Sequence, residues 1–191
     1  MILIVYFVAL AAPDSAVERT VAELERDVRH ALSTEGRASD LSNIVTRYLD
    51  VEELASYALD PQWQSLASED RSRLVSLIRD VIVLQAQLRL RRPVDFEVRV
   101  DRIQRAGQYV AAFATLEPDS VEPTRLSVTF RQRGGAWRVV DVSVDGSSVA
   151  RQYREALYDL LSRSGVSAVV NKLSKRKREL KQGRGKTRSQ R

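Results

Sequence analysis

The stretch "WRVVDVSVDGSSVARQYREALYDLL", from Trp137 to Leu161, changes its hydrophobic period at Gly146 and holds no obvious catalytic group. Before this glycine, valines alternate with polar residues, which predicts a half-buried strand. After it, apolar residues recur three or four positions apart, which is typical of one face of a helix. The segment therefore predicts a strand and a helix around one apolar interior. The expected inward residues are Val140, Val142 and Val144 on the strand and Val149, Tyr153 and Leu157 on the helix.

The opposite change of period occurs at Pro93. Before it, capping residues and apolar stripes predict helices that begin near Ser15, Ser39, Asp50 and Ser68. The apolar stripe of the first helix consists of Val17, Val21, Leu24, Val28 and Leu32. That of the second consists of Leu41, Ile44, Val45 and Tyr48. The last is the longest, and its broad apolar band suits a helix covered on more than one side. From this band we place Leu77, Val81, Ile82, Leu84 and Leu88 toward the interior.

After Pro93, four segments alternate apolar with polar residues and are separated by turns such as "RAGQ" and "RGGA". They predict four mostly antiparallel strands. The expected inward residues of the first three are Phe96, Val98, Val100, Tyr109, Phe113, Leu126, Val128 and Phe130. The other side is polar, so we expect water on it and helices on the inward side. We interpret the strand acids Asp95, Glu97, Asp101, Asp141 and Asp145 as part of the solvated side rather than as a catalytic or cation-binding group.

This order of elements predicts the α+β class. We expect one curled, four-stranded, mostly antiparallel sheet wrapped by helices, with the last helical region divided at Gly165. The length suits a single domain with a real core, which we place over residues 17–173.

The two ends of the chain differ from this domain in composition. Residues 1–16 contain the apolar run Ile2–Leu10 and an A-x-A site, which predicts a secretory signal peptide; a buried first strand or helix is the alternative. Residues 174–191 have no apolar stripe and predict a disordered basic tail. From Asn171 to Arg191 there are ten Lys and Arg against one acid, Glu179, whereas the rest of the chain holds 21 Arg and 24 acidic residues.

The basic tail is compatible with three roles. It can be a solubilising extension, a contact for an anionic bilayer, or a contact for nucleic acid. The tail has no aromatic residues and resembles no nucleic-acid-binding module, and export would remove the chain from nucleic acid. These observations disfavour nucleic acid as a partner.

Composition excludes several kinds of chemistry. The chain has no cysteine and one histidine, His30, so it holds no thiolate metal site and no cysteine nucleophile. It also lacks a phosphate-binding loop, a G-x-S-x-G motif and any cluster with metal-ligand spacing. We therefore expect no metal and no cofactor. The inward apolar residues can either fill an ordinary core or line a cleft for an apolar ligand, and periodicity does not separate these alternatives.

Two segments carry a family resemblance. The stretch "GAWRVVDVSVDGSSVARQYREALYDLLSRSGVSAVVNKL" places Trp137, Asp141, Asp145-Gly146, Ser148, Tyr153-Arg154 and Gly165-Val166 in a fixed order, and "YLDVEELASYALDPQWQSLASEDRSRLVSLI" forms a second motif. Over residues 17–173 the chain resembles the MlaC-type family of periplasmic lipid-binding proteins, also called the toluene-tolerance family. It departs from the family at Asp60-Pro61, where a glycine is usual.

The resemblance implies a non-enzymatic periplasmic carrier that acts as a monomer. Such a protein holds phospholipid acyl chains between the sheet and the helices, so the resemblance favours an open pocket lined by the inward residues of the long helix, the strands and the late helix. We expect the lipid head group at the mouth, near Arg89, Arg91 or Arg92. The implied partners are a MlaA-like outer-membrane lipoprotein and the MlaD-like substrate-binding subunit of an inner-membrane ABC transporter.

Two alternatives to a phospholipid carrier stay open. One is a hopanoid-associated or other apolar-ligand member of the same family. The other is a cone-shaped α+β enzyme, which needs a carboxylate of raised pKa inside the cavity.

Overall fold

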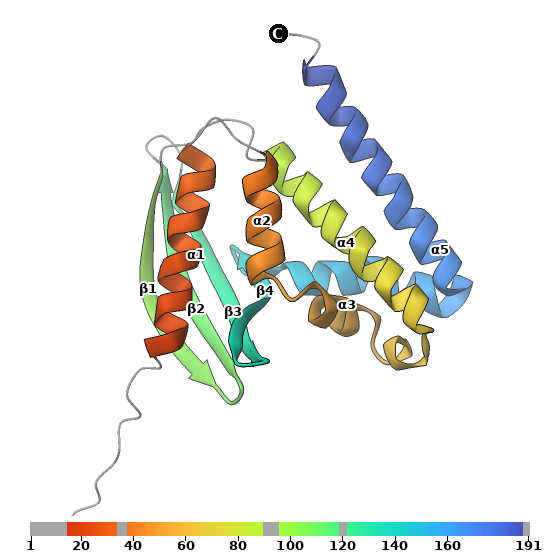
Figure 1. Ribbon diagram of the computed structural model, residues 1–191, viewed down its shortest axis with the longest axis horizontal. Helices are drawn as coiled ribbons and strands as arrows, with labels where there is room; N and C mark the ends of the chain where they lie inside the picture. Colours follow the sequence, from red (N-terminus) through yellow and green to blue (C-terminus); the bar gives the residue numbers. More distant parts are fainter. Residues whose placement is uncertain (1–14, 34–37, 90–95, 119–121, 189–191) are drawn as a thin grey trace, which may run out of the picture.

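A computed structural model describes residues 15–33, 38–89, 96–118 and 122–188, in which helices are followed by strands and a final helix (Figure 1). The helices are α1 (Ser15–Ser33), α2 (Ala38–Tyr48), α3 (Val51–Leu59), the short 3-10 helix η1 (Gln62–Ser65), α4 (Ser68–Arg89) and α5 (Val149–Arg188). The strands are β1 (Phe96–Ala106), β2 (Tyr109–Pro118), β3 (Thr124–Arg133), β4 (Ala136–Val144) and β5 (Ser147–Ser148). The predicted α+β class is confirmed, and β5 adds a two-residue strand to the four that were expected.

The sheet follows chain order, β1-β2-β3-β4-β5, with every neighbouring pair antiparallel. The β3–β4 hairpin turns through Gly134 and Gly135, which have φ angles of 57° and 80°. Both angles lie in the region that a two-residue hairpin turn requires and that glycine adopts without strain. The turn thus fixes the register of the two strands that carry the key polar contacts.

A bulge in β4 changes which residues face the helices. Phe130 pairs with Val139, but the preceding residue of β3, Thr129, pairs with Asp141, so Val140 is the extra residue. Such an insertion shifts the alternation of side chains by one position. The side chains on the face covered by helices are therefore those of Trp137, Val139 and Val142. Val140, which we predicted to face inward, is the bulged residue, and Val144 lies at the exposed end of the strand.

Buried apolar side chains form two separate clusters, so the molecule has two cores. Figure 1 shows α1 and α2 over the sheet and α3, α4 and α5 beside it. The sheet core joins α1 and α2 to the strands through Val17, Val21, Tyr48, Val110, Ala112, Phe130, Trp137 and Val139. The helical core joins α3, α4 and α5, and its most buried members include Leu54, Leu59, Leu74, Ile78, Leu157 and Val169.

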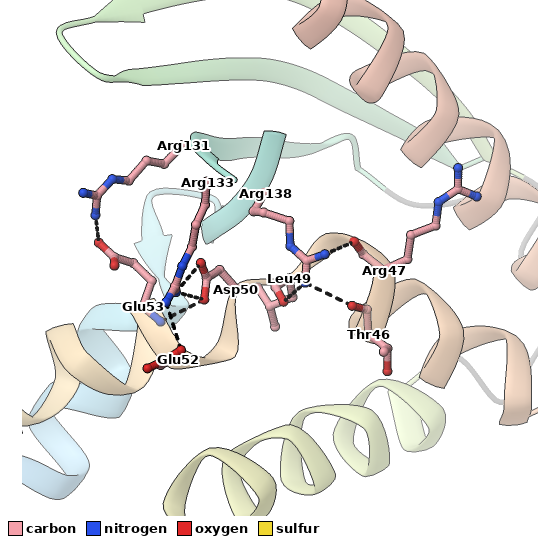
Figure 2. Close-up of polar contacts among 9 residues, drawn as sticks. All are labelled: Thr46, Arg47, Leu49, Asp50, Glu52, Glu53, Arg131, Arg133 and Arg138. Carbon is pink, nitrogen blue, oxygen red and sulfur yellow. Dashed lines mark hydrogen bonds and ion pairs between the residues drawn. The ribbon is translucent and has the colours of Figure 1, made fainter. Parts of the chain in front are cut away.

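The end of α2 is held by one arginine of β4 (Figure 2). Arg138 donates hydrogen bonds to the carbonyl oxygens of Thr46, Arg47 and Leu49, at 3.1, 2.6 and 3.1 Å. The last carbonyls of a helix lack partners within the helix, and a cation there also complements the helix dipole. Leu49 additionally forms a parallel bridge with Val139, so the chain leaves α2 along the edge of β4.

The start of α3 is held by two further arginines of the β3–β4 hairpin (Figure 2). Asp50 is the N-cap of α3 and accepts a hydrogen bond from the backbone N–H of Glu53 at 3.1 Å. Its two carboxylate oxygens also accept bonds from Arg133 at 3.0 and 2.9 Å, which raises the pKa of that guanidinium. Arg133 reaches Glu52 as well, and Arg131 pairs with Glu53. Only 8% of Asp50 is exposed, so this carboxylate depends on its partners.

Two acids that we interpreted as solvated also have structural partners. Asp141 accepts hydrogen bonds from the Ser148 hydroxyl at 2.7 Å and from the backbone N–H of Ala150 at 2.9 Å. The Ser148 oxygen in turn accepts a bond from the N–H of Arg151 at 3.0 Å, as an N-cap does. Asp145 accepts a backbone N–H from β3 at 2.9 Å. Besides facing water, these acids therefore stabilise the start of α5 and the end of β4 through hydrogen bonds.

The last helix is kinked at Gly165, whose φ of 73° and ψ of 178° divide it as predicted. Beyond the kink the helix continues through much of the segment 174–191 that we expected to be disordered. There Leu180 is 5% exposed within the helical core, and Lys177 pairs with Asp80 of α4. One buried leucine and one ion pair, rather than a repeated apolar stripe, extend the packing of this helix.

We predict that Asp50→Ala destabilises the protein by about 2–3 kcal/mol, because it removes the N-cap and leaves Arg133 without its main partner. Urea denaturation followed by circular dichroism measures the change. Glu52→Ala is the matched control: Glu52 bonds the same arginine, but its side chain is 54% exposed, and we expect a loss below about 0.5 kcal/mol. Equal losses in the two variants would contradict the role given to Asp50.

Candidate functional site

A cavity of about 530 Å³ lies between the sheet and the helices α1 and α2. Its helical wall consists of Val21, Leu24, Glu25, Val28, Ile44, Val45, Tyr48 and Leu49, with Ile82 from α4. Its sheet wall consists of Val98, Val100, Ala112, Ala114, Leu116, Thr124, Leu126, Val128, Phe130, Val139 and Val142. This volume is typical of ligand pockets, which span about 300–1,000 Å³.

Small side chains on β2 create much of this space. Ala112 and Ala114 face the cavity, whereas Tyr109 and Phe113 point to the other side of the sheet. On that outer side, the guanidinium of Arg102 stacks on Phe113, with its carbon 4.1 Å from the ring centre. We predicted Tyr109 and Phe113 in the lining, and the structure places the alternate residues there. The large rings thus lie on the outer face of the sheet, where arginine side chains cover them, and the small alanine side chains leave the cavity open.

Seven predicted residues do line the cavity: Ile82, Val98, Val100, Leu126, Val128, Phe130 and Val142. They come from four different elements of the predicted fold. Directly paired residues in antiparallel strands share a face, and Val128 pairs with both Ala112 and Val142. The pairing therefore brings these side chains together on one wall.

The remaining predicted residues of the helices lie in the helical core instead. They are Leu77, Val81, Leu84 and Leu88 of α4 and Val149, Tyr153 and Leu157 of α5. Helix α4 is apolar on several sides, so Ile82 reaches the cavity while the rest of the band packs against α3 and α5. The side chains of Phe96 and Arg89, and all of Arg91 and Arg92, lie outside the part of the chain that the structure describes.

The cavity wall formed by α1 and α2 was not among the predicted site residues. Its members Val21, Leu24, Val28, Ile44, Val45 and Tyr48 belong to the two apolar stripes recognised in the sequence. The signal for these residues was therefore present as helical periodicity. Helical periodicity does not indicate that these two helices, rather than α4 and α5, cover the sheet.

Two polar groups in the lining are bound by neighbouring side chains. The hydroxyl of Tyr48 donates a hydrogen bond to Asp27 at 2.7 Å. Burial, assisted by this bond, raises the pKa of Tyr48 to about 12, so the phenol is neutral at physiological pH. Glu25 accepts a bond from Arg29 at 2.7 Å on the same helix. Both groups belong to helices, and of the strand residues described in the lining only Thr124 has a polar side chain.

Within the described part of the chain, no three His, Asp or Glu side chains are grouped so that they could hold a metal ion. Among the described residues, the lining contains a single carboxylate, Glu25, and its side chain is 28% exposed and paired with an arginine. A general base of raised pKa requires the opposite setting, an apolar pocket without a neutralising partner.

No helix among the described residues has the length and apolar character needed to cross a bilayer.

The lining defines what the cavity can bind. Water inside it would find few hydrogen-bond partners, since nearly all of the wall is aliphatic. An aliphatic chain needs no such partners and gains about 0.8 kcal/mol for each CH₂ removed from water. The geometry therefore suits a long apolar ligand better than a polar one.

A family model and a solved structure match this chain. A family model described as "MlaC protein" matches residues 14–175. A solved structure, described as the phospholipid-binding protein from Ralstonia solanacearum in complex with a phospholipid, has the same fold with a TM-score of 0.76. It is 18% identical in sequence, and the match covers 85% of this chain and 97% of that one. No curated protein matches the chain.

We predict that Tyr48→Phe costs about 1 kcal/mol of stability, because it removes the buried hydrogen bond to Asp27. Thermal or urea unfolding measures the loss. Tyr153→Phe is the contrast: burial also raises the pKa of Tyr153 to about 12, but its hydroxyl has no hydrogen-bond partner among the described residues. We expect Tyr153→Phe to be neutral within about 0.5 kcal/mol or stabilising. The reverse order of the two effects would refute this assignment.

Proposed function

The chain belongs to the MlaC family, and we propose that it is a lipid carrier that holds the acyl chains of a phospholipid in the cavity between the sheet and α1 and α2. The observation that carries the proposal is the size and aliphatic lining of that cavity. The match to the family model, which covers residues 14–175, supports the proposal.

An empty cavity of this kind is costly for the protein. When no ligand is bound, its aliphatic wall stays exposed to solvent, at a cost of about 25 cal/mol for each Å² of apolar surface. A ligand that fills the space and contributes its own apolar contacts removes this cost, which supports a resident lipid over a vacant cleft.

The proposed role in the cell is to shuttle lipid through the periplasm. A phospholipid in water exposes acyl chains whose hydration costs about 0.8 kcal/mol for each CH₂. Its passage between two membranes therefore needs a protein that encloses these chains in an apolar cavity. The two partners proposed by family analogy are a MlaA-like outer-membrane lipoprotein and a MlaD-like subunit of an inner-membrane ABC transporter. The signal peptide expected in residues 1–16 would deliver the protein to that compartment.

Among the described residues that line the cavity, the alternative of an enzyme has one candidate group, Glu25. Its pairing with Arg29 at 2.7 Å, and its place on a helix surface, argue against a role as a general base. The ligand within the lipid class stays open between a phospholipid and another acyl or polycyclic lipid, and identification of the extracted lipid decides between them.

We predict that protein purified from a bacterial host carries phospholipid, and that Ala114→Phe abolishes this loading. The new ring would occupy the space of about three or four methylene groups, which lowers affinity on the order of a hundredfold. Native mass spectrometry and mass spectrometry of extracted lipid provide the measurement.

The matched control for this experiment is Ala111→Phe on the same strand. Ala111 lies on the outer face between Tyr109 and Phe113, where a ring meets no cavity. We expect this variant to retain its lipid. If wild-type protein carries no lipid and takes up none, or if both variants load as wild type does, the cavity is not the binding site.

A second prediction concerns transfer. The delipidated protein should move a self-quenched fluorescent phospholipid from donor to acceptor vesicles at a rate proportional to protein concentration, whereas Ala114→Phe should leave transfer at the spontaneous rate. Fluorescence dequenching follows the process. Tight binding without transfer would indicate a storage protein instead of a carrier.

A further inference from the structure

The second half of α5 presents a basic face that the lipid cavity does not use. Lys175, Arg178 and Lys181 are three residues apart, so they lie along one side of the helix, and all three are exposed. None of them is paired with an acid among the described residues. Neighbouring cations differ: Lys177 pairs with Asp80, and Arg176 pairs with the one acid of this segment.

The charge is concentrated on this segment rather than spread over the molecule. Ten Lys and Arg stand against one acid from Asn171 to Arg191, while the rest of the chain holds slightly more acids than arginines. Much of the basic segment also lies beyond residues 14–175, the part that matches the family. Its net charge is opposite in sign to that of the rest of the chain.

The apolar side of this helix is already occupied. Leu173 and Leu180 are buried in the helical core, and Lys177 bonds to Asp80 of α4. An amphipathic helix that lies in a membrane inserts its apolar side, and here that side is not free. A partner of this helix would therefore contact its basic face alone, while the buried apolar side holds the helix in place.

We propose that this basic face of α5 docks the protein on the surface of an anionic phospholipid bilayer. A row of cations on a convex helix suits an extended plane of negative charge. The segment contains no aromatic side chain on which bases could stack. Helix α4 contributes Ile82 to the lipid cavity and Asp80 to the contact with α5, so one helix separates the docking face from the cavity.

The preference for a lipid surface over nucleic acid rests on the proposed function as a lipid carrier. The charge and the packing of α5 are observed independently of that function. Docking of this kind raises the concentration of an empty or loaded carrier at the membrane without insertion. It is electrostatic, so it must weaken steeply as ionic strength shortens the Debye length.

The test is cosedimentation of the full chain with vesicles of equal parts phosphatidylglycerol and phosphatidylcholine, and with vesicles of phosphatidylcholine alone. The triple variant Lys175→Gln, Arg178→Gln, Lys181→Gln should bind the anionic vesicles on the order of a hundredfold more weakly, because each cation near an anionic surface contributes a factor of about five. Wild type should be released by high salt and should not bind the uncharged vesicles.

A charge-matched control separates a local face from net charge. Arg19, Arg73 and Arg163 are exposed on α1, on α4 and on the first half of α5. Arg19→Gln, Arg73→Gln, Arg163→Gln should retain binding within a few-fold. Equal losses in the two triple variants would overturn the proposal. Salt-resistant binding, or equal binding to phosphatidylcholine, would also overturn it, because the apolar run Ile2–Leu10 would then be the anchor.

Two further measurements separate a failure of the docking proposal from a failure of the proposed carrier function. Ala114→Phe should lose lipid loading but dock on anionic vesicles as wild type does; loss of both would show that docking runs through the cavity and would refute a separate face. Duplex DNA at the same ionic strength should bind more weakly than the anionic vesicles, and tighter binding to DNA would reverse the choice of partner. Absence of loaded lipid with intact docking would contradict only the carrier function.

Discussion

The attachment of the α2–α3 junction to the β3–β4 hairpin is the constraint on which the rest of the architecture depends. Only Leu49 and Asp50 separate the two helices, and Arg138 and Arg133 bind the chain on either side of this link. With both ends fixed, α2 must lie over the sheet while α3 turns toward α4 and α5. The contacts therefore hold α2 at one position above the strands, and the space beneath it is preserved rather than closed by collapse onto the sheet.

That space exists because the sheet distributes its side-chain volume unevenly. On β2 the alanines 112 and 114 face α1 and α2, while Tyr109 and Phe113 face away and are covered by arginines. A sheet with the opposite arrangement would fill its interior and gain the packing contacts of an ordinary core. Placing the rings outside sacrifices some of this stabilisation, and the guanidinium groups recover part of it through cation–π contacts.

The sequence predicts the order of elements, the hairpins and the division at Gly165, because each depends on local periodicity and turn residues. The cavity wall on β2 is harder to predict, because both faces of that strand carry apolar residues and their size favours the larger ones for the interior. The bulge at Val140 has no local signal, because the extra residue shows only in the pairing of two strands. Leu180 lies on the same helix face as Leu173, but Lys177 interrupts the apolar stripe between them, so the burial of Leu180 depends on where α4 lies.

The division into two cores explains how the fold tolerates an open interior. The helical core of α3, α4 and α5 is built around fully buried residues such as Leu74 and Ile78, and none of its buried residues lines the cavity. The energy of folding can therefore come mainly from this core, while the sheet core contributes less and keeps room for a ligand. Helix α4 serves both, because Ile82 lines the cavity and the rest of its apolar band packs on the other helices. A ligand that enters or leaves would then change the sheet side of the molecule without disturbing the packing that keeps it folded.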